Sequence, residues 1–233
     1  MKKLVLIGGG DIGRGNTSYE TKEIDEKIVK LTGIAKPNLL FIGLASSFSD
    51  SYYDTIKKIY RDLGCECAYL KKKNIINNPD IVKEKINKAN IIYIGGGDTV
   101  KLINDIKEYK IDELLLEAYN RGCVLAGTSA GAILLSNSGY SDSYILRGES
   151  NKYEFIKGLG LTNINFCPHY HSSKEKDEEL ESDLKGFKEP VYCLENCTAL
   201  EILDNNIKVI KAKENAKVFK LSYEDQLEII EIE

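Results

Sequence analysis

The chain has 233 residues, of which 42% are hydrophobic and 29% charged, and its formal net charge is −4. This composition excludes a disordered chain, a collagen-like chain and a dense disulfide scaffold, and it supplies enough apolar material for a sizeable core. The near-neutral charge, with acids interspersed among bases, argues against nucleic acid or a membrane surface as the partner.

The length, at about 150 residues per domain, allows one or two domains, and we expect a single α/β domain over residues 1–233. No stretch approaches the roughly 18–20 apolar residues that span a membrane. The first apolar run, residues 4–7, is shorter than the hydrophobic part of a signal peptide. We therefore expect a cytoplasmic protein, with its six cysteines reduced and buried as small apolar side chains.

Short apolar runs alternate with amphipathic segments in the first part of the chain. The runs predict buried strands at residues 4–7, 39–45, 67–70, 91–94 and 123–126. The amphipathic segments predict helices at residues 23–31, 52–63, from Pro79 onward, and at 100–106, 112–120 and 130–136. Strand and helix in alternation predict an α/β fold, a mostly parallel sheet with helices on both faces.

The pattern changes after about residue 138. Residues 138–151 are polar and predict a loop, residues 164–167 a strand and residues 173–184 a charged helix. Alternating runs then predict a β-rich C-terminal end, with a hairpin turn at Asn205-Asn206 and strands at residues 191–194, 199–203, 207–210, 218–221 and 227–232. The strands after residue 203 either cap the sheet or pair between the subunits of a homodimer, and the sequence favours neither.

A glycine-rich segment, residues 8–13, matches the G-x-G-x-x-G pattern of dinucleotide-binding proteins directly after a strand. The acid that would bind the ribose at the end of the second strand is absent there, because that strand runs into Gly-Leu-Ala-Ser-Ser. We interpret the segment as a tight turn at the carboxyl end of a sheet strand, where ligand crevices of α/β sheets lie. No cofactor is expected.

The sharpest motif is Gly-Thr-Ser-Ala-Gly at residues 127–131, between a predicted strand and a predicted helix. It fits the G-x-S-x-G nucleophile elbow, in which a strained turn presents the serine hydroxyl above the sheet. We expect Ser129 to be a nucleophile. The backbone N–H of Ala130 would then face the oxyanion position, and the glycine turn at residues 95–97 would supply a second donor from the other side.

A serine nucleophile needs a base, and the chain has two histidines, His169 and His171. Both follow a predicted strand, and their spacing does not choose between them. Two histidines could also bind a metal, but no third ligand is near, and no metal is expected. The base needs an orienting group, for which Glu195, at the end of the 191–194 strand, and Asp142, in the polar loop, are candidates.

Together these residues resemble the peptidase E and cyanophycinase family of serine peptidases. The resemblance rests on residues 93–99, 126–132, 167–170 and 193–196, and it covers about residues 1–203. It implies a fold like that of the class I glutamine amidotransferases and a triad of Ser129, His169 and Glu195, with Gly97 and Ala130 as the oxyanion hole. Further substrate contacts are expected from Gly96, Asp98, Thr99, Tyr170 and His171.

The aspartyl dipeptidases of this family hold the substrate's aspartate with an arginine beyond the histidine. This chain has no arginine after Arg147, and segment 172–185 offers only Lys174, Lys176 and Lys185 as bases. Lysine supplies a point charge where arginine supplies a fork of donors, so a preference for N-terminal aspartate does not follow. We expect a serine exopeptidase for dipeptides or short peptides. The alternatives are a cyanophycinase-like β-aspartyl hydrolase and a ligand-binding homologue without activity.

Overall fold

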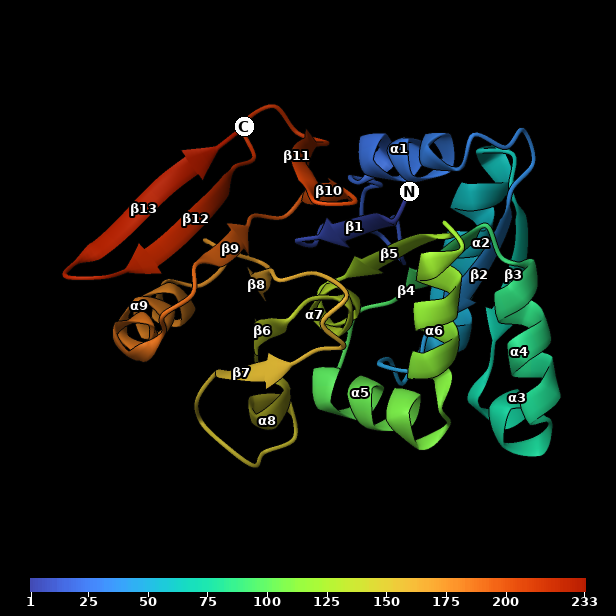
Figure 1. Cartoon of the computed structure of the whole chain (residues 1–233), viewed down its shortest axis with the longest axis horizontal. Helices are drawn as coiled ribbons and strands as arrows, with labels where there is room; N and C mark the ends of the chain where they lie inside the picture. The colour runs from blue at the N-terminus through green and yellow to red at the C-terminus, as the bar shows by residue number, and fades with distance from the viewer.

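The computed structural model describes residues 1–233, apart from the side chain of Pro79. A seven-stranded sheet forms one half of the molecule (Figure 1). Its parallel centre has the order β1-β5-β4-β2-β3, and β10 and then β11 extend it antiparallel beyond β1. The strands are β1 (Lys3–Ile7), β2 (Asn38–Ile42), β3 (Glu66–Leu70), β4 (Ile91–Ile94), β5 (Val124–Thr128), β10 (Thr198–Leu203) and β11 (Asn206–Lys211).

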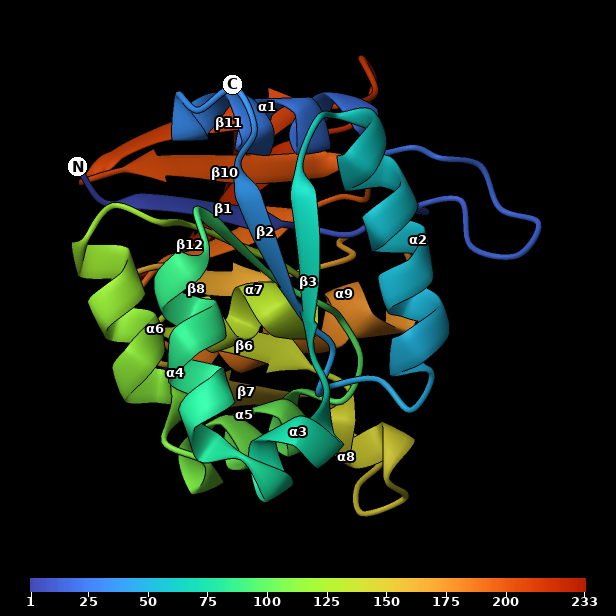
Figure 2. The ribbon, with the colours of Figure 1, turned by 90° about the vertical axis from the view of Figure 1, so that its right-hand side faces the viewer.

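Helices cover both faces of this sheet, as the alternating pattern predicts (Figure 2). On one face, α1 (Lys22–Thr32) and α2 (Ser49–Asp62) bury one set of alternating strand side chains, including Val5, Phe41 and Tyr93. The opposite set, including Leu6 and Ile92, shares an apolar cluster with other helices. Four of these are α4 (Pro79–Lys88), α5 (Thr99–Glu108), α6 (Ile111–Asn120) and α7 (Ala130–Leu135).

A second sheet of six strands forms the other half, in the order β13-β12-β9-β8-β6-β7. Its buried residues Phe166, Leu194 and Val218 belong to the same apolar cluster as α7 and the first sheet, so one core runs from sheet to sheet. Its elements are β6 (Ser138–Ser141), β7 (Glu154–Lys157), β8 (Asn165–Cys167), β9 (Val191–Leu194), β12 (Val218–Tyr223) and β13 (Leu227–Ile232), with α8 (Ser143–Leu146) and α9 (Lys174–Asp183) beside it.

The expected α/β class and β-rich C-terminal end are confirmed, and four local predictions are wrong. Residues 138–151 hold β6 and α8, because Tyr140 buries its ring in an apolar cluster despite the polar composition around it. The structure adds α3 (Lys72–Asn77) and β7. Strand β2 ends at Ile42, because Gly43 begins a turn. The β10–β11 turn is Asp204-Asn205, because Leu203 pairs with Asn206.

All six cysteines are free, and five of them are buried. None of the described helices combines the length and the apolar character needed to cross a membrane.

Candidate active site

Ser129 occupies a sharp turn between β5 and α7. Its backbone is strained, with φ of 52° and ψ of −114°, in a region that side chains other than glycine rarely adopt. The two flanking glycines are required by space. A Cβ on Gly127 would lie 2.3 Å from the carbonyl oxygen of Gly131, and one on Gly131 would lie 2.2 Å from that of Ile94. The strand–turn–helix geometry expected of an elbow is therefore present, and steric crowding explains both of its glycines.

His169 reaches Ser129 from the second sheet. It follows β8 and Pro168 and has a positive φ of 53°. Its backbone N–H donates to the carbonyl oxygen of Gly8 at 2.9 Å, which fixes the position of its backbone. Its ring Nε2 lies 3.0 Å from the Oγ of Ser129, which is hydrogen-bond distance. Of the two histidines that the sequence left open, the structure therefore places His169 on the serine.

The other ring nitrogen of His169 is held by Asn196. Nδ1 lies 2.7 Å from the side-chain oxygen Oδ1 of Asn196. An amide oxygen only accepts hydrogen bonds, so Nδ1 carries the proton and donates a hydrogen bond to Asn196. Nε2 is then unprotonated and can accept the hydroxyl proton of Ser129. The contact thus selects the tautomer that a general base needs.

Glu195, which was the expected partner of His169, lies elsewhere. Its Oε1 is 2.7 Å from Nδ1 of His171, and its Oε2 accepts the backbone N–H of Lys217 at 2.8 Å. Glu195 and Asn196 are consecutive residues just after β9, and their side chains contact different histidines. The expected contact between Glu195 and His169 is therefore wrong.

His171 and Tyr170, two expected substrate contacts, have other partners as well. Tyr170 is buried in the apolar cluster beneath the second sheet and packs edge-on against Phe219. The His171 ring stacks beside that of Tyr170, with centroids 4.1 Å apart, and is held by Glu195. Neither residue lines the cavity at Ser129. The pair fastens the segment that carries His169 to β12.

The first glycine turn packs directly against the His169–Asn196 pair. Gly9 has a φ of 140°, and a Cβ there would lie 2.3 Å from both the Asn196 Oδ1 and the Cε1 of His169. Only glycine combines this conformation with so close an approach. The turn thus borders the site, as expected for the carboxyl end of a strand.

Burial lowers the pKa of His169 below its ordinary value of 6.5, and the hydrogen bond to Asn196, which raises it, offsets only part of that effect. Desolvation disfavours the charged imidazolium, and Asn196 supplies no negative charge to compensate. His169 is therefore neutral, and able to act as a base, at neutral pH.

A cavity of about 280 Å³ opens beside Ser129 and His169, on the α7 side of the sheet. Gly97 and Thr99 line it, as expected, and so does Asp142, the other candidate acid. Asp142 makes no hydrogen bond to His169 among the described contacts, although its charge acts to raise the pKa of that histidine. Lys176 is the cation in the lining. It is buried, and its Nζ donates to the carbonyl oxygen of Pro168.

Gly96 and Asp98, two further expected contacts, lie next to this cavity without lining it. A Cβ on Gly96 would lie 3.3 Å from the Cβ of Ser129. The carboxylate of Asp98 caps α5 by accepting the N–H of Lys101 at 3.0 Å. The Gly97 N–H donates to no backbone carbonyl among the described contacts. That of Ala130, the first residue of α7, has no partner within the helix.

A serine on a strand–turn–helix elbow, paired with a histidine at the carboxyl edge of a parallel sheet, is the arrangement of an α/β serine hydrolase. The chain matches the model of peptidase family S51 over residues 4–210, and it belongs to that family. It is therefore a serine-type peptidase.

Among curated proteins, the chain is 27% identical to the peptidase YgaJ of Bacillus subtilis, over 100% of this chain and 96% of that protein. It is 26% identical to peptidase E of Nostoc, over 97% and 92% of the two chains. A probable alpha-aspartyl dipeptidase of Drosophila melanogaster is 27% identical, over 78% and 75%. Among solved structures, a peptidase from an acI-B1 actinobacterium overlaps 99% of this chain and 97% of its own, with a TM-score of 0.73 and 23% identity, which shows the shared fold.

Proposed function

We propose that this protein hydrolyses dipeptides or short peptides through an acyl-enzyme formed on Ser129. The observation that carries the proposal is the 3.0 Å contact between the Ser129 Oγ and the His169 Nε2 at a strained elbow. Membership of family S51 and the dipeptidase name of one relative favour a peptide bond as the target. The small cavity beside the serine suits a short substrate better than a long chain.

In this mechanism, Ser129 attacks the scissile carbonyl while its hydroxyl proton passes to Nε2 of His169. Asn196 holds the ring by accepting a hydrogen bond from the Nδ1–H group. The N–H groups of Gly97 and Ala130 donate to the oxyanion, and each such donor contributes about 3–4 kcal/mol where it has been measured in another peptidase. The imidazolium then protonates the leaving amine, and the C–N bond breaks. Water, deprotonated by His169, hydrolyses the ester and frees Ser129.

Intact-mass spectrometry after incubation with a fluorophosphonate tests this proposal. We expect one adduct on the wild type and none on Ser129→Ala or His169→Ala, because the first lacks the nucleophile and the second its base. Hydrolysis of a dipeptide library by the same three proteins supplies the second readout. A folded wild-type protein that forms no adduct and cleaves no dipeptide would refute the proposal, as would full turnover by Ser129→Ala.

A further inference from the structure

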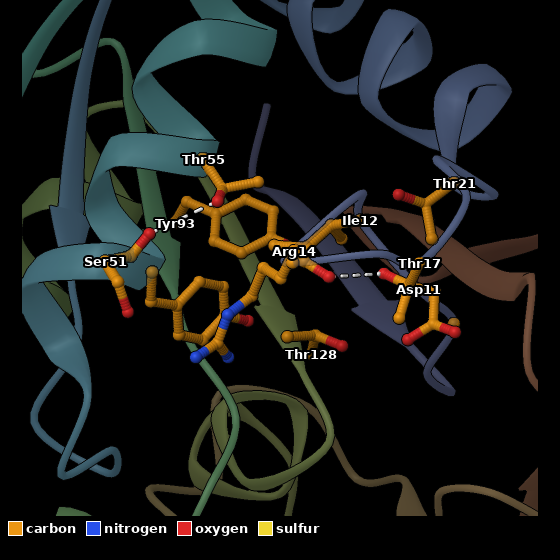
Figure 3. Close-up of a pocket in the computed structure, with 12 residues that line it drawn as sticks. Asp11, Ile12, Arg14, Thr17, Thr21, Ser51, Thr55, Tyr93 and Thr128 are labelled. Atoms are coloured by element: carbon orange, nitrogen blue, oxygen red, sulfur yellow. Dashed lines mark hydrogen bonds between the residues drawn. The ribbon is translucent and has the colours of Figure 1, made fainter.

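A second cavity, of about 560 Å³, lies between the loop after β1 and helix α2 (Figure 3). Ser51, Tyr52 and Thr55 of α2 line it, together with Tyr93 of β4 and Thr128. The 280 Å³ cavity lies on the opposite, α7 face of the sheet. The end of β5 thus borders two cavities, since Thr128 lines this one and Ser129 the other, and the mechanism above uses only the second.

Three links tie this second cavity to the reacting groups. Thr128, in its lining, directly precedes Ser129. Gly10, also in the lining, follows the glycine that packs on His169. The hydroxyl of Tyr52 accepts the N–H of Gly96 at 3.4 Å, next to the expected oxyanion donor Gly97.

Arg14 supplies the positive charge of this cavity. It comes from the loop after β1, which extends past α2 in Figure 2. Its guanidinium carbon lies 4.7 Å from the centroid of the Tyr52 ring, a cation–π contact that holds the group in place. Figure 3 shows the side chain crossing the cavity, with Ser51 and Thr128 on either side of it. No carboxylate of the described residues pairs with it.

The loop that presents Arg14 is fixed by hydrogen bonds. The carbonyl oxygen of Arg14 accepts both the N–H of Thr17, at 3.1 Å, and its hydroxyl, at 3.0 Å. Ile12 and Tyr19 form an antiparallel bridge across the base of the loop. Because the backbone at Arg14 is set in advance, little ordering is required when a ligand arrives.

Hydroxyl donors stand around the guanidinium. Tyr93 is only 1% exposed, yet it lines the cavity, and its hydroxyl has no hydrogen bond within the described part of the chain. Burial raises the pKa of Tyr52 to about 12, so that phenol also keeps its proton at neutral pH. Asp11, the acid in the lining, lies on the far side of the cavity from the Arg14 guanidinium in Figure 3. The free donors therefore favour an anion.

We infer that this cavity binds the free C-terminal carboxylate of the substrate, on the leaving side of the scissile bond, with Arg14 as its partner. The inference rests on the proposed function. A peptide lying across Ser129 would place its acyl residue in the 280 Å³ cavity and its leaving residue toward Arg14. Guanidinium binds carboxylate with two parallel hydrogen bonds, so the site would select peptides that end just beyond the cleaved bond.

The test compares a dipeptide substrate with the same dipeptide amidated at its C-terminus. For the wild type we expect kcat/KM to be about 10-fold to 100-fold higher for the free acid, the range of a hydrogen bond to a charged group. In Arg14→Met this ratio should fall to about 1, and Arg14→Lys should keep an intermediate ratio. Arg61→Met, on the same helix as Tyr52 but nine residues further on, is the matched control and should keep the wild-type ratio. A wild-type ratio near 1, or one that survives in Arg14→Met, overturns the inference.

Calorimetry on Ser129→Ala separates this inference from the proposed function. We expect the free dipeptide to bind more tightly than the amide, and the difference to vanish in the double variant Ser129→Ala/Arg14→Met. Inorganic phosphate is the second probe, and binding of phosphate through Arg14 without any preference for the free acid overturns the carboxylate assignment. The carboxylate assignment is also overturned if the free dipeptide does not bind to Ser129→Ala. Preferential binding by a protein that cleaves no peptide supports the inference and refutes the proposed function alone.

Discussion

Asn196, a neutral amide, holds the Nδ1 side of His169 at 2.7 Å, and the adjacent carboxylate of Glu195 is bound to a different imidazole, that of His171. His169, the base in the proposed mechanism, therefore has its tautomer fixed by a neutral group and not by a carboxylate. In the triads with aspartate, the charge of the carboxylate also stabilises the imidazolium. In the proposed reaction, the imidazolium formed on His169 would have the amide dipole of Asn196 beside it and the charge of Asp142 acting from outside hydrogen-bond contact.

Replacing Asn196 by alanine should lower kcat/KM about 10-fold to 100-fold, because the ring loses one hydrogen bond and its fixed tautomer. Glu195→Gln is the matched control and should stay within about 3-fold of the wild type, since glutamine can keep the contact with His171. Steady-state kinetics on one dipeptide measures both. A larger loss in Glu195→Gln than in Asn196→Ala would restore Glu195 as the orienting residue.

The pH dependence of kcat/KM should show a base whose pKa lies below that of an ordinary histidine. Only neutral His169 can accept the serine proton, so the rate rises with pH through the pKa of this histidine and then levels off. Because burial lowers that pKa, the midpoint should lie below pH 6.5. In Asn196→Asp the added carboxylate favours the imidazolium, and the midpoint should move upward. A midpoint that stays put in this variant would contradict the contact.

Gly9→Ala should reduce kcat/KM by about 100-fold or more, because its Cβ would meet the His169 ring at 2.3 Å and displace it from Ser129. Gly33→Ala is the control: it also has a positive φ, of 68°, but nothing lies within 4 Å of its Cβ. It should cost about 1 kcal/mol of stability and leave the rate unchanged. Equal rates for the two variants would show that Gly9 does not position the base.

Asp25 of α1 should make the protein less stable as the pH rises through mild acid. Its carboxyl is buried and accepts hydroxyl hydrogen bonds from Tyr60, Thr21 and Tyr19 at 2.7–3.0 Å. Burial raises its pKa from 3.8 to about 6, and the three hydrogen bonds offset this only in part. The folded state therefore keeps a proton that the unfolded chain has already released between about pH 4 and pH 6. At about 1.4 kcal/mol per pH unit, the free energy of unfolding should fall by about 3 kcal/mol across that window.

Urea unfolding at a series of pH values measures this effect. The fall should shrink in Asp25→Asn, which cannot titrate, and should persist in Asp225→Asn, at an exposed position between β12 and β13. Because other groups titrate in the same window, the difference between the wild type and Asp25→Asn isolates this carboxyl, and a difference that does not change from pH 4 to pH 6 would contradict the raised pKa.

The sequence predicted the parts of this molecule that depend on local pattern. Apolar runs such as residues 91–94 identified the buried strands, and the spacing of small residues around Ser129 identified the elbow, because both patterns follow from packing alone. Tyr140 shows where local pattern fails. Its ring is buried by elements distant in sequence, and residues around it form strand β6 although their composition predicts a loop.

The orienting residue could not be predicted for a different reason. Glu195 and Asn196 are consecutive, and which of them faces His169 depends on the path of the backbone beyond β9. Chemistry and the family resemblance both favoured the carboxylate. Arg14 was missed because it lies in a loop without periodicity, and only the folded chain brings it onto Tyr52. The only sequence signal for Asn196 as a site residue was its position two residues beyond a core strand. Many other polar residues share such a position.

The backbone contacts of Gly8 join the first strand to two segments that are synthesised much later, near His169 and Thr198. Gly8 donates to the carbonyl oxygen of Thr198 and accepts the N–H of His169, both at 2.9 Å. Ser129, His169 and Asn196, the nucleophile, the base and the residue that holds the base in the proposed mechanism, therefore meet only when residues 169–198 have docked on the first strand. Contacts so distant in sequence form late. If the proposed mechanism holds, a nascent chain on the ribosome would lack peptidase activity even with Ser129 already folded into its elbow, and the appearance of activity would mark the end of folding.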